Sequence, residues 1–265
     1  VFPLITFPYV TRVLGAVSYG KYSFSASIIS YIVLIAGLGI GTYATREGNR
    51  LREDKEKLKQ FINEVYTLNV CSTLFSFIIL IFLIAFWTKI TPYTSIILIL
   101  SIQVIATLLG TEWINLIFEE FKFITIRYLI CQAISLVFLL VFVKSSEDIL
   151  LYAMMSVLTN VLASSANFIY IRKHDIHPSV VLNKNVFRHI KPVLLLFSYT
   201  VVSMIYINSD ITILGILKND YDVGIYTASS KIFSILKQIV GAAVVVVIPR
   251  VSLWIEQGEQ QKIST

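Results

Sequence analysis

The chain has 265 residues, of which 56% are hydrophobic and only 14% charged, with a formal net charge of +6 at pH 7. Soluble globular domains carry about 25% charged residues, so this composition excludes an ordinary water-soluble domain. The apolar residues form runs long enough for helices of ~20 residues to cross the ~30 Å hydrocarbon core of a bilayer, which predicts an all-α polytopic membrane protein.

About eight membrane-crossing helices are predicted along the chain. We place them at residues 1–12, 20–43, 65–87, 93–111, 124–143, 149–171, 192–217 and 225–248. The first begins at Val1, inside an apolar run without a charged flank, and is expected to be truncated. The chain is therefore expected to be a fragment of a longer protein, and no signal peptide is recognisable in it.

The connections between these helices differ in their content of Lys and Arg. The connections at 46–59, 112–127 and 172–191, together with the tail at 249–265, hold 15 such residues, whereas the alternating connections hold 5. The positive-inside rule places the richer group in the cytoplasm. The net positive charge is then explained by the cytoplasmic face and anionic lipid headgroups rather than by a nucleic acid. We expect a multi-pass membrane protein whose Lys- and Arg-rich connections face the cytoplasm.

A duplicated stretch predicts the domain organisation. GKYSFSASI at Gly20–Ile28 aligns with GIYTASSKI at Gly224–Ile232 at an offset of 204 residues, and 8 of the 27 positions from residue 20 to 46 are identical. The offset spans six predicted helices, an even number, so both copies cross the membrane in the same direction, as in transporters built from parallel repeats. We expect an N-terminal six-helix lobe at 1–175, a cytoplasmic linker at 176–191 and the start of a C-terminal lobe at 192–265.

Charged residues inside the predicted membrane segments are candidates for a substrate pathway, because each costs about 2.5–3.5 kcal/mol to insert. The candidates are Arg12, Asp210, Lys231 and Lys237. The alternatives are an interfacial anchor for Arg12, a polar contact between helices for Asp210, and snorkelling for the lysines. Under the repeat, Arg12 and Asp210 are also candidates for opposite walls of one cavity.

Arg46 and Arg250 are equivalent under the repeat and stand at the inner ends of their helices. They form a candidate inner gate, although the positive-inside rule alone also explains each of them.

The sequence carries no recognisable catalytic, metal or cofactor motif. The two cysteines, Cys71 and Cys131, fall in apolar runs and are expected to be small core residues. The three histidines, His174, His177 and His189, share one predicted cytoplasmic connection without metal-ligand spacing and are expected to be solvated. We therefore expect a transporter that is not an enzyme, with no catalytic residue, no metal and no cofactor.

Three stretches resemble Wzx-type polysaccharide flippases, the O-antigen repeat-unit transporters. They are FPLITFPYVTRVLGAVSYGKYSFSASI followed by GLGIGTYATREGNR, then GTEWINLIFEEFKFITIRYLI at 110–130, and SDITILGILKNDYDVGIYTASSKI at 209–232. The resemblance implies the multidrug/oligosaccharidyl-lipid/polysaccharide exporter superfamily, with a MATE-like fold of two six-helix lobes around a central cavity. Within the second stretch, Glu112, Glu119 and Glu120 surround Trp113 and are expected to be structural.

The same resemblance implies the substrate and the mechanism. The substrate would be an undecaprenyl-pyrophosphate-linked oligosaccharide, moved from the cytoplasmic to the periplasmic leaflet by alternating access. The resemblance also implies a location in the bacterial cytoplasmic (inner) membrane. Membrane lipids are expected to surround the protein there, and the polysaccharide polymerase and chain-length regulator are candidate partners.

Two other readings are left open by the residues. One is a drug or cation antiporter of the same superfamily that uses Asp210 as an ion site; the cations Arg12, Lys231 and Lys237 favour an anionic cargo instead. The other is a membrane enzyme such as a polysaccharide polymerase or ligase. The short predicted periplasmic connections TKITPY, KSSEDI and KNDYDV disfavour it.

Overall fold

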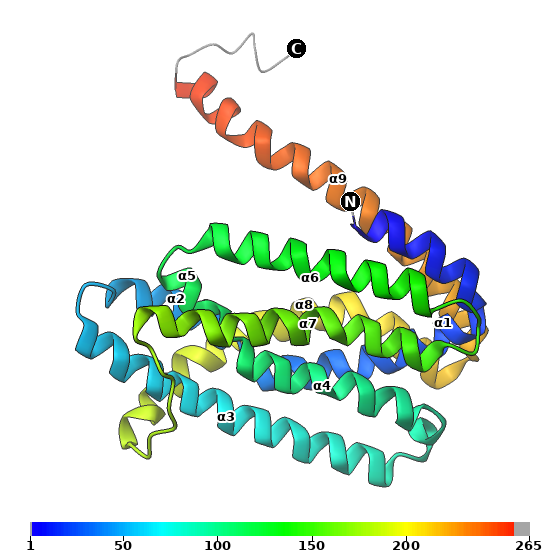
Figure 1. The fold of residues 1–265 in the computed structure, drawn as a ribbon, viewed down its shortest axis with the longest axis horizontal. Coiled ribbons are helices and arrows are strands. Elements are labelled where there is room, and N and C mark those ends of the chain that lie inside the picture. The colour runs from blue at the N-terminus through cyan, green and yellow to red at the C-terminus, as the bar shows by residue number, and fades with distance from the viewer. Residues whose placement is uncertain (1, 257–265) are drawn as a thin grey trace.

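The structure, a computed structural model, describes the backbone of residues 2–256; the side chains of residues 2–4, 174, 239 and 242–256 are outside the described ones. Every regular element in this range is a helix, and Figure 1 shows the helices running side by side in an elongated bundle. The elements are α1 (Phe2–Gly37), α2 (Ile40–Arg50), α3 (Lys55–Phe86), η1 (Thr88–Tyr93), α4 (Thr94–Gly110), α5 (Glu112–Ile117), α6 (Phe121–Phe142), α7 (Ile149–Tyr170), η2 (Ile171–His174), η3 (Lys184–His189), α8 (Ile190–Leu217) and α9 (Asp220–Glu256). The all-α prediction is confirmed for the described residues.

Six stretches of the described chain are long and apolar enough to cross a membrane: Ile5–Arg50, Lys55–Phe86, Thr88–Ile117, Phe121–Phe142, Ile149–Lys173 and Lys184–Leu217. They support the prediction of a polytopic membrane protein. The number of eight crossings stays a prediction.

Gly15 interrupts the first of these stretches. Its backbone is non-helical, with φ 70° and ψ 173°, a region that glycine reaches without the steric cost of a Cβ atom. The whole stretch has 46 residues and would measure about 70 Å at 1.5 Å per residue, more than twice the ~30 Å core. In Figure 1 the dark blue part of α1 reaches one end of the bundle and the chain then runs back along it.

From Asn69 to Phe82, the polar and apolar faces of α3 are largely reversed relative to those of a soluble helix. Its buried side includes Asn69, Ser72 and Ser76, while Phe75 and Phe82 are 57% and 60% exposed. Lipid is as apolar as a protein core, so helices in a membrane pack through small and polar residues and leave large apolar side chains outward. α3 also begins ten residues before the predicted segment, because Asp54 caps it by accepting a hydrogen bond from the Lys57 backbone N–H at 3.1 Å.

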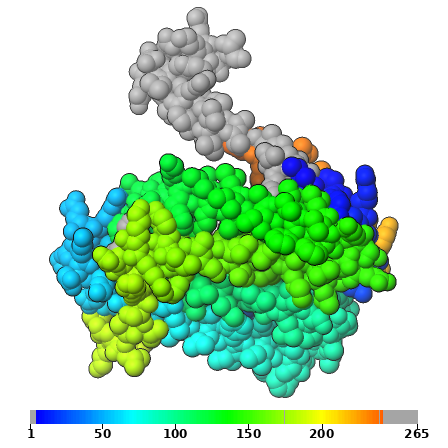
Figure 2. Space-filling view, viewed as in Figure 1, coloured from blue at the N-terminus to red at the C-terminus, as the bar shows by residue number. Residues whose placement is uncertain are grey.

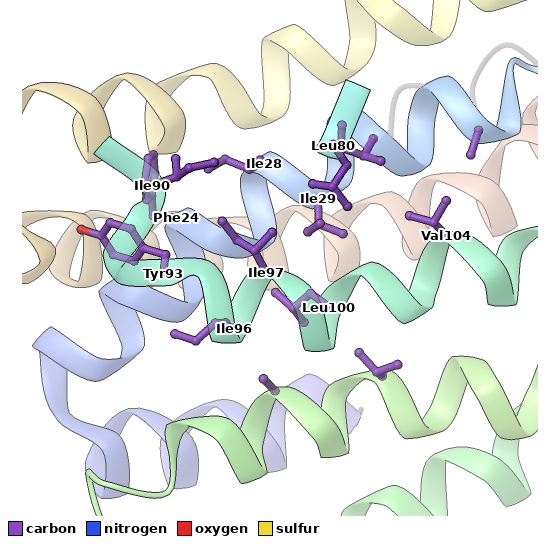
Figure 3. Packing of buried hydrophobic residues seen from close by; sticks show 14 of the residues in the cluster. Phe24, Ile28, Ile29, Leu80, Ile90, Tyr93, Ile96, Ile97, Leu100 and Val104 are labelled. Carbon is purple, nitrogen blue, oxygen red and sulfur yellow. The ribbon is translucent and has the colours of Figure 1, made fainter. Parts of the chain in front are cut away.

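The central apolar cluster joins α1, α3, η1 and α4 (Figure 3). Phe24 and Ile29 of α1, Leu80 of α3, and Ile97 and Leu100 of α4 are all at most 2% exposed. α7 packs on the same cluster through Ala153 and Val157. This packing holds α1, α4 and α7 side by side, and Figure 2 shows α7 and α6 (green) covering one face of the bundle.

The contact between α1 and α9 is made through two glycines. A Cβ atom on Gly20 would lie 1.8 Å from the backbone oxygen of Asp220, and one on Gly224 would lie 2.0 Å from the backbone oxygen of Ala16. Only glycine fits at such a close approach. Beyond this contact α9 runs away from the rest of the bundle (Figure 1).

Hydrogen bonds attach the segment between α7 and α8 to α3. Asn63 Oδ1 accepts from the Ser179 backbone N–H at 3.0 Å, and Thr67 Oγ1 accepts from the Val181 backbone N–H at 2.9 Å. Further along, the ring Nε2 of His189 lies 2.9 Å from a carboxylate oxygen of Glu64.

The prediction that the three histidines are solvated is wrong for His189, which is 3% exposed. The ring is buried because the neighbouring apolar residues Ile176 and Val193 join a second cluster with α2 and α3, and because Tyr43 and Glu64 hydrogen-bond its two ring nitrogens. His177 is exposed as predicted, and the side chain of His174 is outside the described ones.

Candidate functional site

α7 presents a polar stripe along one side. Tyr152, Ser156, Thr159, Asn160 and Ser164 follow one another at intervals of three or four residues or are adjacent, and residues at this spacing share one face of a helix. These side chains line two hollows, which we call the inner hollow and the outer hollow, and Asn160 belongs to both. The stripe from Tyr152 to Ser164 measures about 18 Å at 1.5 Å per residue, more than half of the ~30 Å hydrocarbon core.

The inner hollow encloses about 470 Å³ and lies toward the end of the bundle where α2 and α5 are found. Its polar lining consists of the amides Asn69, Gln103 and Asn160, the hydroxyls Thr107, Thr111 and Ser164, the indole of Trp113 and the carboxylate of Glu112. Among the described residues of this lining Glu112 is the one ionisable group, and its carboxylate is paired with Arg127 of α6 at 2.7 Å. The wall is therefore polar with little uncompensated charge.

Trp113 is held in this wall by the short helix α5. Thr111, just before α5, has a φ of 34° and turns the chain sharply after α4. On α5, Asn115 donates a hydrogen bond to Asn167 of α7, which in turn donates to the carbonyl of Gly110. Trp113 is 6% exposed, and its buried Nε1–H has no hydrogen-bond acceptor among the described residues.

The outer hollow encloses about 350 Å³ between α1, α6, α7 and α9. Its described aromatic lining consists of Phe7 and four tyrosines, Tyr19, Tyr22, Tyr128 and Tyr152. The rings of Tyr22 and Tyr152 lie 4.4 Å apart. Gln132 and Ser135 of α6 add polar groups, and Thr159 of α7 donates a hydrogen bond to Ser135 Oγ at 2.6 Å.

Three amide side chains of the two hollows are without hydrogen-bond partners in the described part of the protein: Gln103, Gln132 and Asn160. Each amide has two N–H donors and an acceptor oxygen. Gln103 and Gln132 are half-buried and Asn160 is exposed, so these amides are accessible groups that a polar ligand or water in the hollows would satisfy.

Of the predicted pathway residues, Lys231 lines the outer hollow. Arg12 instead lines a third, mostly apolar hollow of about 540 Å³ between α1 and α9, with Phe7, Ile232 and Leu236. Asp210 of α8 accepts a hydrogen bond from Tyr226 of α9.

Arg12 and Asp210 form no ion pair within the described residues. Lys237 is exposed on α9. The assignment of Arg12, Asp210 and Lys237 to one cavity stays a prediction.

Of the two predicted gate residues, the structure describes the side chain of Arg46 and the backbone of Arg250. Arg46 is exposed on α2, with its Nε 3.3 Å from a carboxylate oxygen of Glu47. Arg250 belongs to α9, but its side chain is outside the described ones. Their role as a gate stays a prediction.

The carboxylates around Trp113 are each ion-paired, which fits the structural role expected for them. Besides the Glu112 pair, Glu119 lies 3.0 Å from Arg52, and Glu120 lies 3.9 Å from Lys173. These pairs join three connections at one end of the bundle. Within the described ranges, no group of three or more His, Cys, Asp or Glu residues is placed to hold a metal ion.

The site residues predicted from the sequence are all charged, so the neutral side chains that line the two hollows were missed. Gln103, Gln132, Asn160 and the tyrosines are uncharged, and single uncharged polar residues in an apolar helix give a weak signal. The spacing of polar residues on α7 was the available clue, because Ser156, Asn160 and Ser164 recur every four residues.

Comparison with known proteins identifies the family. The family described as "Polysaccharide biosynthesis protein" matches residues 1–253. The chain is also 21% identical over 255 residues to the "Putative O-antigen transporter" of Escherichia coli (strain K12), covering 94% of this chain and 60% of that protein. The chain thus spans about three fifths of the length of that relative, and no solved structure matches it. The resemblance to Wzx-type flippases is confirmed, and the chain belongs to the polysaccharide biosynthesis protein family.

Proposed function

We propose that the full-length protein is a flippase that moves undecaprenyl-pyrophosphate-linked oligosaccharide units from the cytoplasmic to the periplasmic leaflet by alternating access. The observation that carries this proposal, beside family membership, is the pair of hollows that share Asn160. Their lining offers amides, hydroxyls and aromatic rings along a stripe of α7 that is about 18 Å long. Such a lining suits a hydroxyl-rich cargo that must cross an apolar layer without leaving its polar groups unpaired.

The cationic residues are proposed to serve the anionic part of the cargo. Lys231 brings a mobile positive charge to the outer hollow, and lysine binds phosphate as a point charge. Arg12, Asp210 and Lys237 are proposed as further pathway residues, and Arg46 with Arg250 as an inner gate.

The contact between α1 and α9 supports a two-lobed, MATE-like organisation. Gly20 approaches Asp220, and Gly224 approaches Ala16; residues 16 and 220, like 20 and 224, are 204 positions apart. Such reciprocal contacts are what a two-fold relation between equivalent surfaces produces. We propose that the six-helix unit at 1–175 and the unit that begins at 192 are the two lobes, joined by the attached linker at 176–191.

The proposed setting is the bacterial inner membrane, with transport rather than catalysis as the activity. The cargo is membrane-embedded, so the proposed partners are the polymerase and chain-length regulator that would act on the transferred unit.

The test is a deletion of the full-length gene in cells that make the surface polysaccharide. Undecaprenyl-linked repeat units should accumulate on the cytoplasmic leaflet, and wild-type protein should relieve the accumulation. Asp210→Ala and Lys237→Ala should insert normally and fail to relieve it. Ile102→Ala, which removes a 44% exposed apolar side chain of α4, is the matched control.

Unchanged surface polymer together with altered tolerance to cationic drugs would overturn the flippase proposal in favour of the antiporter.

A further inference from the structure

Gln103, Trp113 and Asn160 bring two amides and an indole to the inner hollow from three different helices. Gln103 comes from α4, Trp113 from α5 and Asn160 from α7. The central apolar cluster holds α4 against α7, and the hydrogen bonds of Asn115 and Asn167 fix α5 relative to both of them. The three groups therefore converge on a wall that is formed before any ligand binds.

The unpartnered atoms of this wall match the hydroxyl groups of a sugar. The amides of Gln103 and Asn160 can each donate and accept, as adjacent hydroxyls of a sugar ring require. The buried Nε1–H of Trp113 is a further donor without an acceptor in the described part of the chain. A wholly apolar ligand would leave all of these groups unpaired, which is unfavourable.

The charge of the two hollows differs in sign. Of the Glu112–Arg127 ion pair, the carboxylate end belongs to the described lining of the inner hollow: the Glu112 side chain is 50% exposed, whereas the Arg127 side chain is 6% exposed and is not part of that lining. The outer hollow contains the amine of Lys231. An acidic sugar brought into the inner hollow would lie near a like charge, and like charges in a site of reduced dielectric repel each other. A neutral sugar carries no such penalty.

We infer that the inner hollow is a recognition site for a neutral sugar ring, bound by Gln103, Asn160 and Trp113, and that acidic sugars are disfavoured there. This inference rests on the proposed function and makes it more specific, because it assigns sugar recognition to residues of α4, α5 and α7 rather than to the charged residues of α8 and α9.

The test measures protection of a cysteine in the full-length protein. All native cysteines are replaced by Ser, Ser164 in the inner hollow is changed to Cys, and the rate of maleimide labelling is followed. Glucose and galactose at millimolar concentration are the neutral probes, and glucuronate and galacturonate are the matched acids. The neutral probes should slow labelling, and the acids should slow it severalfold less.

Variants then connect this protection to the named residues. Gln103→Ala and Asn160→Ala should each weaken protection by about 3- to 10-fold, the effect of losing one or two hydrogen bonds. Trp113→Phe keeps an aromatic ring and removes only the N–H donor. It should also weaken protection, and because the ring still fills the wall, misfolding would not explain that weakening. Ile105→Ala, on the same helix as Gln103 and 46% exposed outside the lining, should leave protection unchanged.

Equal protection by neutral and acidic sugars would overturn the inference, and so would absent protection or protection that survives the three variants. The deletion strain keeps the two proposals separate. Accumulation of lipid-linked units without protection contradicts the inner hollow as the recognition site and leaves the flippase standing, whereas protection without accumulation contradicts the flippase.

Discussion

Glu64 shows how a single buried carboxylate organises its surroundings. Its side chain is 0% exposed and receives hydrogen bonds from Gln60 at 2.9 Å and from Arg188 at 2.8 Å, with the His189 ring 2.9 Å away. The other ring nitrogen of His189 lies 2.7 Å from the Tyr43 hydroxyl. One carboxylate of α3 thereby joins η3 directly and α2 through the His189 ring.

Replacing Glu64 by Ala should lower the stability of the protein by about 1–3 kcal/mol, because it leaves the buried ring nitrogen of His189 without its hydrogen-bond partner. The fall should appear as a lower midpoint of thermal unfolding in detergent. Glu56→Ala is the matched control, since Glu56 is exposed on the same helix. Equal midpoints for the two variants would contradict the assigned role.

Asp148 is predicted to make stability depend on acidity at the turn before α7. Hydrogen bonds from the backbone N–H groups of Lys144 and Ser145 lower the pKa of this carboxyl below its usual value of 3.8. A lowered folded-state pKa means that the stabilisation is present above the unfolded-state pKa of about 3.9 and is lost as the pH falls through the folded-state pKa.

The unfolding midpoint of Asp148→Asn should therefore lie below that of wild type near neutral pH, and the gap should close as the pH falls below about 4. A gap that stays constant over this range would contradict the prediction.

At the scale of elements, the α1–α9 contact depends on the absence of side chains at Gly20 and Gly224. Gly20→Ala should push the two helices apart, because the added atom would meet the Asp220 carbonyl oxygen. The unfolding midpoint should fall. Gly41→Ala is the opposite control: nothing lies within 4 Å of its added Cβ, and Ala is favoured over Gly inside a helix by about 0.5–1 kcal/mol. A lower midpoint for both variants would contradict the contact as the cause.

At the scale of the whole molecule, the bundle separates its connections into two groups. The Lys- and Arg-rich connections between helices lie at the end that holds α2 and α5, and the α3–α4, α6–α7 and α8–α9 connections lie at the other end (Figure 1). In a cysteine-free full-length protein, Glu53→Cys should react with an impermeant maleimide only from the cytoplasmic side, and Ser146→Cys only from the periplasmic side. Labelling of both from one side would overturn the orientation.

The sequence by itself was sufficient for the fold class and for most helix positions, because long apolar runs with few charges admit few structures other than membrane-spanning helices. The sequence also contains the 204-residue repeat, which includes the glycine pair Gly20 and Gly224. The structure gives a steric reason for both glycines, which apolar composition does not explain. The start of α3 was missed because Asp54 extends that helix beyond its apolar part.

The tertiary structure alone decided which neutral side chains meet. Gln103, Trp113 and Asn160 lie far apart in the chain, and each is an ordinary polar residue until the packing of α1, α4 and α7 brings them to one hollow. The burial of His189 was likewise decided by the docking of its connection on α3. The physical reason is the same in both cases: a charge in a membrane is costly wherever it lies, whereas the cost and use of a neutral polar group depend on its neighbours.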